Sequence, residues 1–200
     1  MDTGTTAFML CCIIGLTLMI PGLALFYGGM VSVKSSTNMM MMTFGAVALV
    51  GVLWVLFGFS MAFGTSYGGL GLLGSITEFA GMKDLVEPMT SVNGLPVSLF
   101  SLFQALFAAI TVALISGAVA DRMKFGAWMI FAGVWAVLVY FPVAHWVFAF
   151  DKTFSDDSVG GWIANKLHAV DFAGGTAVHI NAGAAALAVA IVLGKSAMFG

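Results

Sequence analysis

The sequence predicts an all-α integral membrane protein whose chain crosses the bilayer five times. Of its 200 residues, 61% are hydrophobic and only 8% are charged, and the mean hydropathy is +1.08. A soluble domain needs a much larger charged surface, so this composition excludes the soluble globular classes. The formal net charge of −2, without any basic run, gives no indication of nucleic-acid binding.

Five uncharged apolar stretches are long enough to span a bilayer, which takes about 20 residues. They occupy residues 7–31, 39–63, 97–120, 125–150 and 174–193. Each is expected to be a helix, because a helix satisfies its own backbone hydrogen bonds in lipid. In the first stretch, Pro21 predicts a kink. The adjacent Cys11 and Cys12 are expected to be buried small hydrophobic residues and not a disulfide framework or a metal site.

The distribution of charge predicts the orientation of the chain in the membrane. The short connections after the first, third and fifth stretches carry Lys34, Arg122, Lys124 and Lys195, with Asp121 as their only acid. The N-terminus and the longer connections carry the remaining acids and lysines: Asp2, Glu78, Asp84, Glu87, Asp151, Asp156, Asp157, Asp171, Lys83, Lys152 and Lys166. Positive charge in short loops marks the cytoplasmic side. The N-terminus is therefore predicted outside the cell and Gly200 inside.

One acid and one imidazole mark the fifth stretch. Asp171 precedes it and His179 lies within it. An ionisable group at such depth is costly in hydrocarbon and is a candidate for function. On one continuous helix the two residues would lie about 12 Å apart along the axis and ~80° apart around it, on one broad face. We expect Asp171 to cap the helix and to favour cations as well. Periodicity leaves His179 open between a pore-lining residue and a histidine bonded to a neighbouring helix.

Aromatic residues gather in the third and fourth stretches. Phe103 and Phe107 flank Gln104 and share one helix face, which ordinary packing explains. Residues 140–148 contain Trp146 and Phe148 and are typical of an interfacial aromatic belt. Aromatic faces also attract small cations, by about 2 kcal/mol or more once desolvated. His145 is interpreted as a packing histidine and His168 as a solvated loop residue.

The block Asp171-Phe-Ala-Gly-Gly-Thr-Ala-Val-His-Ile-Asn-Ala-Gly183 resembles the signature of the ammonium transporter family (Amt/MEP/Rh). Blocks at residues 21–29, 103–107 and 117–122 agree with that family in order and spacing, and residues 140–145 fit as well. The resemblance covers nearly the whole chain. It implies an eleven-helix channel built from two inverted five-helix repeats and assembled as a trimer, of which this chain matches the first repeat.

The resemblance also implies roles for individual residues. Phe103, Gln104, Phe107, Trp146, Phe148 and Asp171 would form the outer cation site. Phe107 would be one of two stacked gate phenylalanines, and His179 the first of two pore histidines. Many members of the family carry tryptophan where this chain has Phe148. Phenylalanine has the weaker cation–π face, so we expect a weaker outer site, or one in which Trp146 partly substitutes.

The implied activity is transport and not catalysis. Ammonium would be recruited at the aromatic vestibule and lose a proton near the gate, and ammonia would cross an apolar, histidine-lined pore into the cell. Methylammonium would serve as an analogue, the cell membrane as location and a PII-type cytoplasmic protein as regulator, with no cofactor. Three alternatives stay open: an ammonium sensor of the same fold, a haem or redox protein using His145 and His179, and an isolated half without a complete pore.

Overall fold

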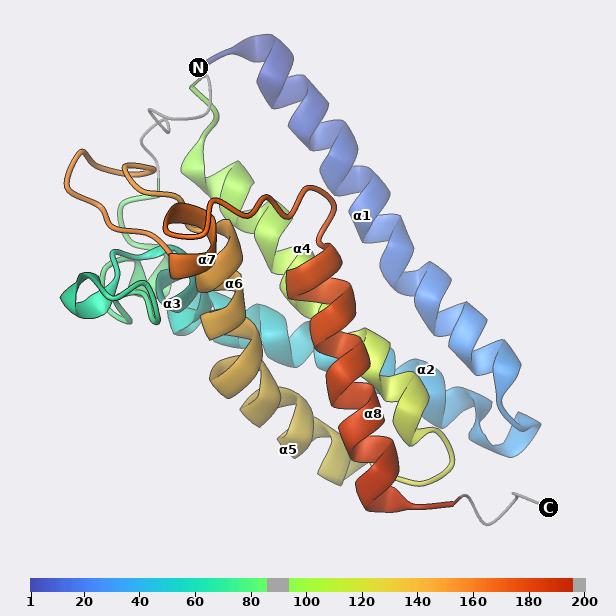
Figure 1. Cartoon of the computed structure of the whole chain (residues 1–200). Coiled ribbons are helices and arrows are strands. Elements are labelled where there is room, and N and C mark those ends of the chain that lie inside the picture. Colours follow the sequence, from blue (N-terminus) through green and yellow to red (C-terminus); the bar gives the residue numbers. More distant parts are fainter. Residues whose placement is uncertain (86–93, 196–200) are drawn as a thin grey trace.

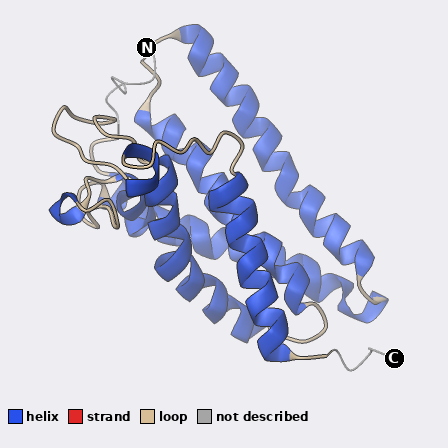
Figure 2. Ribbon diagram, in the orientation of Figure 1, coloured by secondary structure: helices blue, strands red, loops and turns tan. Residues whose placement is uncertain are grey.

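The computed structural model describes residues 1–85 and 94–195, and within these ranges the chain consists of helices and loops without a strand (Figures 1 and 2). Five helical segments are long and apolar enough to cross a membrane. They run from Thr3–Met30, Val33–Phe63, Val97–Val119, Phe125–Phe148 and Gly175–Leu193. The predicted five-span, all-α membrane architecture is thus confirmed. Glu87 and Gly200, both used in predicting the orientation, lie outside the described residues.

Three of the five spans contain a π-helical turn. The second span consists of α2 (Val33–Leu53), a π turn (Trp54–Gly58) and α3 (Phe59–Phe63). The fourth consists of α5 (Phe125–Trp135), a π turn (Ala136–Tyr140) and α6 (Phe141–Phe148). The fifth begins with a π turn (Gly175–Ile180) and continues as α8 (Asn181–Leu193). Such turns are rare in proteins overall, but those that occur are frequently located at functional sites.

The first and third spans are simpler. The first is a single helix, α1 (Thr3–Met30), that runs continuously through Pro21. The third is α4 (Val97–Ile115), which tightens into a 3-10 turn at Ser116–Val119. In Figure 1 the N-terminus lies at the end of the bundle that holds the long loops, and α8 ends at the opposite end. The short connections after the first, third and fifth spans therefore lie at one end of the bundle, which is the arrangement that the predicted orientation assumes.

The ends of two spans differ from the predicted ranges. The second span begins at Val33 and not at residue 39, so Lys34 lies in the first turn of α2 and not in a loop. Hydropathy detects only the part of a helix that needs apolar side chains, and the ends of a membrane helix can be polar. The fourth span ends at Phe148. The loop that follows contains a short helix that was not predicted, α7 (Trp162–Asn165).

The prediction that Cys11 and Cys12 are buried is wrong. Cys11 is exposed and Cys12 is only partly covered. Both lie on α1, which stands at the edge of the bundle and buries only Ile13, Ile20, Ala24 and Gly28. In lipid an exposed apolar side chain costs nothing, so an apolar run does not reveal which helices lie at the edge.

The core lies where the second and fourth spans cross. Trp54 and Phe141 are almost fully buried, with ring centroids 5.7 Å apart and planes at 64°. Gly58 leaves room for the Phe141 ring, since a Cβ at Gly58 would lie 2.6 Å from that ring. The Trp54 indole N–H donates to the Ser101 hydroxyl at 3.2 Å, which joins this core to α4. The π turn of the second span, which contains Trp54 and Gly58, therefore packs against the first residue of α6 in the buried core.

Candidate functional site

An apolar groove runs between α1, α4 and the first turns of the fifth span. Its volume is about 380 Å³, and it is lined by Met19, Gly22, Leu23, Phe26, Phe107, Ile110, Leu114, Val178 and His179. α4 contacts both α1 and α8 and lies between them in Figure 1, so it forms the floor of the groove. The structure thus brings Phe107 and His179, which lie on different spans, to one groove.

A second cavity, of about 840 Å³, continues along the same three helices toward the basic end. Tyr27 lines this cavity, and its hydroxyl donates to the carbonyl of Leu114, a residue of the first groove, at 3.1 Å. At its far end, Arg122 donates to the Gly194 carbonyl at 2.7 Å and also bonds the Ala118 carbonyl. The guanidinium therefore ties the end of α4 to the end of α8 beside the cavity.

Most of the residues that line the groove with Phe107 and His179 could have been predicted from the sequence. Met19, Leu23 and Phe26 are spaced by four and three residues on α1, and Phe107, Ile110 and Leu114 by three and four on α4. Such spacing places side chains on one face of a helix. The lining was missed because every face of these helices is apolar, so periodicity alone does not distinguish a groove from lipid or core.

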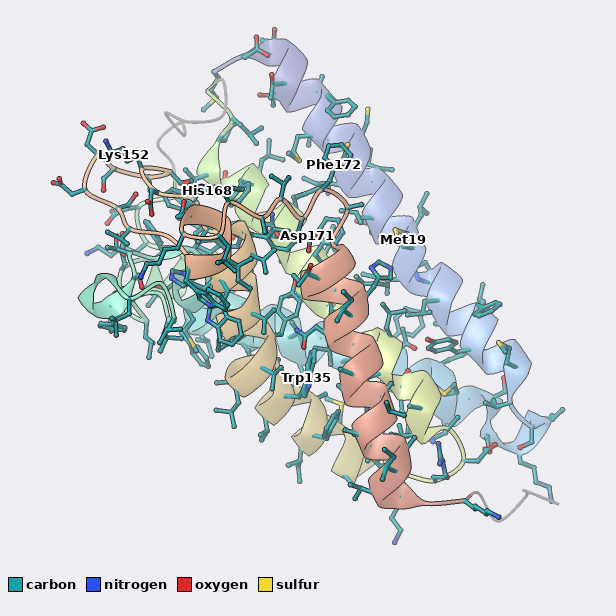
Figure 3. The ribbon with its side chains drawn as sticks, in the orientation of Figure 1. Met19, Trp135, Lys152, His168, Asp171 and Phe172 are labelled. Atoms are coloured by element: carbon teal, nitrogen blue, oxygen red, sulfur yellow. The ribbon has the colours of Figure 1, made fainter. Side chains whose placement is uncertain are left out.

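Asp171 caps the fifth span from outside the helix. Its carboxylate accepts three backbone N–H groups, from Gly175 at 2.7 Å, Thr176 at 2.8 Å and Ala177 at 3.0 Å. Gly174 adopts a left-handed conformation, with φ of 76°, immediately before the helix begins. The assumption of one helix from Asp171 to His179 is therefore wrong, and so is the common face derived from it. Figure 3 shows Asp171 at the head of this span, with Met19 on α1.

His179 is held by the same turn of backbone. Its Nδ1 lies 3.2 Å from the Gly174 carbonyl oxygen, and its backbone N–H donates to that oxygen at 3.1 Å. Because a carbonyl can only accept, the side-chain hydrogen bond requires the proton on Nδ1 and leaves Nε2 as an acceptor. The imidazole lines the groove and is not covered by the described chain. This hydrogen-bond partner, Gly174, lies on its own turn and not on a neighbouring helix.

The aromatic candidates fall into two places. On α4, the rings of Phe103 and Phe107 lie 5.0 Å apart at 73°, and Gln104 between them is buried. On α6, the Trp146 indole N–H donates to the Leu72 carbonyl at 2.6 Å. Trp146 and Phe148 are two positions apart, which separates them by about 200° around a helix. The bond to Leu72 holds Trp146 against the loop that follows the second span, on a side of α6 different from that of Phe148.

Phe148 itself is partly buried and packs against the hydrophobic core. α6 contacts the π turn at Gly175–Ile180, and α4 contacts that turn as well. Phe148, Phe107 and His179 therefore belong to three elements that meet at the head of the fifth span. Trp146 lies on the same helix as Phe148, but its indole bonds the loop at Leu72.

The other two histidines have separate surroundings. His145 is fully buried, and its Nδ1 lies 3.1 Å from the Ala62 carbonyl oxygen on α3, as expected of a packing histidine. His168 is exposed in the loop before Asp171. Ligation of one haem by His145 and His179 requires both rings to face a common space. His145 instead contacts α3 within the core, whereas His179 faces the groove, so this geometry does not support the haem hypothesis.

Five helical segments that are long and apolar enough to span a membrane define a multi-pass helical membrane protein, and three of them line a lateral, apolar groove that contains one imidazole. The chain belongs to the Ammonium Transporter Family, whose model matches residues 7–200. It is 56% identical over 209 aligned residues to the ammonium transporter of Mycobacterium tuberculosis, an alignment that covers 97% of this chain and 43% of the relative.

Solved structures agree with this assignment. The chain resembles Saccharomyces cerevisiae Mep2 with a TM-score of 0.81 and 32% identity, over 97% of this chain and 40% of that one. It also resembles a protein described as a sensor Amt protein, with a TM-score of 0.83 and 26% identity, over 96% of this chain and 44% of that one. The chain thus spans less than half the length of the curated relatives and structures that it matches.

Proposed function

We propose that this chain forms one half of an ammonium transporter and that its substrate crosses the membrane along the groove of α1, α4 and α8. The observation that carries this proposal is the meeting of Phe107 and His179 in one apolar groove. Family membership supports the substrate class, since the M. tuberculosis relative is named an ammonium transporter. A second repeat would cover the groove and supply the partner phenylalanine and histidine.

The chemistry of the groove favours a neutral substrate. Transfer of an ion to an apolar environment costs far more solvation free energy than transfer of a neutral hydrogen-bonding molecule such as ammonia. Ammonium would bind first beside the Phe103 and Phe107 rings, whose faces attract small cations. It would then release a proton to water at the outer face before entering the groove, and ammonia would take up a proton from water on the other side. Potassium has no proton to release and would be excluded.

His179 and Asp171 have different roles in this scheme. His179, with its proton on Nδ1, offers Nε2 as an acceptor for an N–H group of ammonia. Asp171 uses its carboxylate to hold the backbone of residues 175–177 and adds negative charge at the head of the groove. His179 would thus hydrogen-bond the substrate and Asp171 would act on it through charge and backbone structure, and neither would form a covalent bond to it.

The wider arrangement follows from the same proposal. The end with the long loops faces outward, with the N-terminus outside the cell membrane, because the short connections at the other end carry Lys34, Arg122, Lys124 and Lys195 with only one acid. The complete protein would be a trimer with one pore per subunit. A PII-type protein would regulate it from the cytoplasmic side, where the larger cavity opens beside Arg122 and Lys195.

Uptake of methylammonium by the protein in its natural membrane tests the proposal. His179→Ala is expected to change the rate or the selectivity of uptake, and His168→Ala serves as the matched control because His168 is exposed outside the spans. Equal uptake by the wild type, His179→Ala and His168→Ala would remove His179 from the pathway. Absence of saturable uptake by the wild type would remove the transporter proposal itself.

An ammonium sensor is the second candidate, and the likeness to the sensor Amt protein is the observation that favours it. A sensor would bind ammonium at the same outer residues and pass little of it. Binding measured by calorimetry, together with uptake in liposomes, separates the two functions. Binding without flux would favour the sensor, and binding with flux the transporter.

A further inference from the structure

The last turn of α6 is held in place by the loop that follows it. α6 ends at Phe148 because Ala149 adopts an extended conformation, with φ of −84° and ψ of 107°. The Ala149 carbonyl then accepts two hydrogen bonds, one from the Gly161 N–H at 2.8 Å and one from the Asn165 side-chain amide at 2.9 Å. Residues far along the loop therefore bond the backbone immediately after Phe148.

Asn165 bonds both sides of this loop. Its amide nitrogen also donates to the Gly161 carbonyl at 2.7 Å, and its amide oxygen accepts the Asp151 N–H at 2.9 Å. One partly buried side chain thus joins three backbone positions, at residues 149, 151 and 161. Such a side chain fixes the path of the chain on leaving α6, since all three backbone groups would need new partners if it moved.

Gly160 and Gly161 let the loop pack closely against the end of α6, and this close contact restricts independent movement of the two segments. A Cβ at Gly160 would overlap the Ala149 carbonyl oxygen, and a Cβ at Gly161 would overlap the His145 carbonyl oxygen. His145 and Ala149 bracket the last turn of α6, which contains Phe148. Displacement of the segment around residues 160–161 would therefore displace the end of the helix with it.

We propose that Asn165 is a positioning residue for the outer cation site, acting through Phe148. This inference rests on the proposed function and on the place in the outer cation site that the family resemblance gives Phe148. Asn165 does not touch the substrate. It sets where α6 ends and hence how the Phe148 ring stands beside α4 and the head of the fifth span. The chemistry served is recognition of a small monovalent cation by an aromatic face.

The test is saturation kinetics of methylammonium uptake by Asn165→Ala in the complete protein. We expect the half-saturation concentration to rise about tenfold, the factor given by loss of one modest cation–π contact. The maximal rate per transporter should change by less than about twofold, because the variant weakens binding and leaves the groove intact. A merely structural role would instead lower the amount of protein and leave the half-saturation concentration unchanged.

Asn165→Ser is the graded variant, because a hydroxyl can still donate one hydrogen bond. Its half-saturation concentration should lie between those of the wild type and Asn165→Ala. If Asn165→Ala does not reach the membrane, the serine variant decides the question by the same measurement.

Ser158→Ala is the matched control. The wild-type Ser158 hydroxyl donates to the Ser155 carbonyl at 2.9 Å, so this hydrogen bond lies within the same loop and does not involve α6. An unchanged half-saturation concentration in the Asn165 variants, or an equal rise in Ser158→Ala, would overturn the positioning role. Failure of the wild type to take up methylammonium would instead overturn the proposed function, so the two failures are distinguishable.

Discussion

Replacement of Asp171 separates two roles that the structure assigns to one carboxylate. Alanine at this position leaves three backbone N–H groups without their partner at the start of the fifth span. Loss of an N-cap costs 0.5–2 kcal/mol, and a carboxylate that accepts three hydrogen bonds belongs at the upper end, about 2 kcal/mol. Alanine also removes the negative charge. We therefore expect Asp171→Ala to abolish methylammonium uptake and to destabilise the head of the span.

Two conservative variants distinguish the cap from the charge. Asp171→Asn retains one oxygen that can accept, and so keeps part of the cap while it removes the charge. Asp171→Glu keeps the charge but carries it one methylene further, away from the 2.7–3.0 Å geometry of the three bonds. Uptake is measured at equal amounts of protein in the membrane. If capping dominates, asparagine should retain more uptake than glutamate, and if charge dominates, the order should reverse.

Thermal unfolding in detergent reports the stability part of the same prediction. Asp171→Ala should melt below the wild type, since three N–H groups lose a charged acceptor. Normal methylammonium uptake by Asp171→Ala would refute the reasoning, because neither the cap nor the charge would then be needed.

Three further predictions concern other parts of the chain. Phe148→Trp should lower the half-saturation concentration for methylammonium, because indole has the stronger cation–π face, and an unchanged concentration dependence would contradict the weaker-site interpretation. Gly58→Leu should destabilise the protein by about 1–3 kcal/mol by forcing a side chain onto the Phe141 ring, and a melting temperature equal to that of the wild type would contradict this packing. Arg122→Lys should speed hydrogen exchange in the last turn of α8, because lysine cannot bond both the Ala118 and Gly194 carbonyls from one planar group, and unchanged exchange would show that this link does not hold the helix end.

The number and type of the spans could be predicted from the sequence because the bilayer imposes a strong rule. Backbone groups in hydrocarbon must bond within the segment, so an uncharged apolar run of sufficient length can only be a helix there. The same rule does not reveal the ends of a helix, where polar residues are allowed. Lys34 illustrates this limit, since it continues α2 although it lies before the apolar run.

The candidate site was predictable in chemistry and less so in geometry. The capping role of Asp171 followed from an acid before a glycine-led apolar run, but the left-handed Gly174 and the π turn after it left no signal in periodicity. The place of Trp146 was also hidden, because its partner Leu72 is far away in the sequence. Asn165 was missed for the same reason, since its bonds reach back to residues 149 and 151. Contacts between distant loops depend on the fold and cannot be read from local patterns.

The most direct measurement of the central claim is uptake by a variant whose groove is filled. Gly22 lines the groove on α1, and a Cβ there would meet no atom of the described chain within 4 Å, so a side chain can begin at this position without a clash. Gly126, at the start of α5, has equally open surroundings and does not line the groove, so Gly126→Leu is the control. If the groove is the pathway, Gly22→Leu should reach the membrane in normal amount and lose most methylammonium uptake, while Gly126→Leu transports normally. Equal uptake by both variants and the wild type would contradict the claim that substrate passes between α1, α4 and α8.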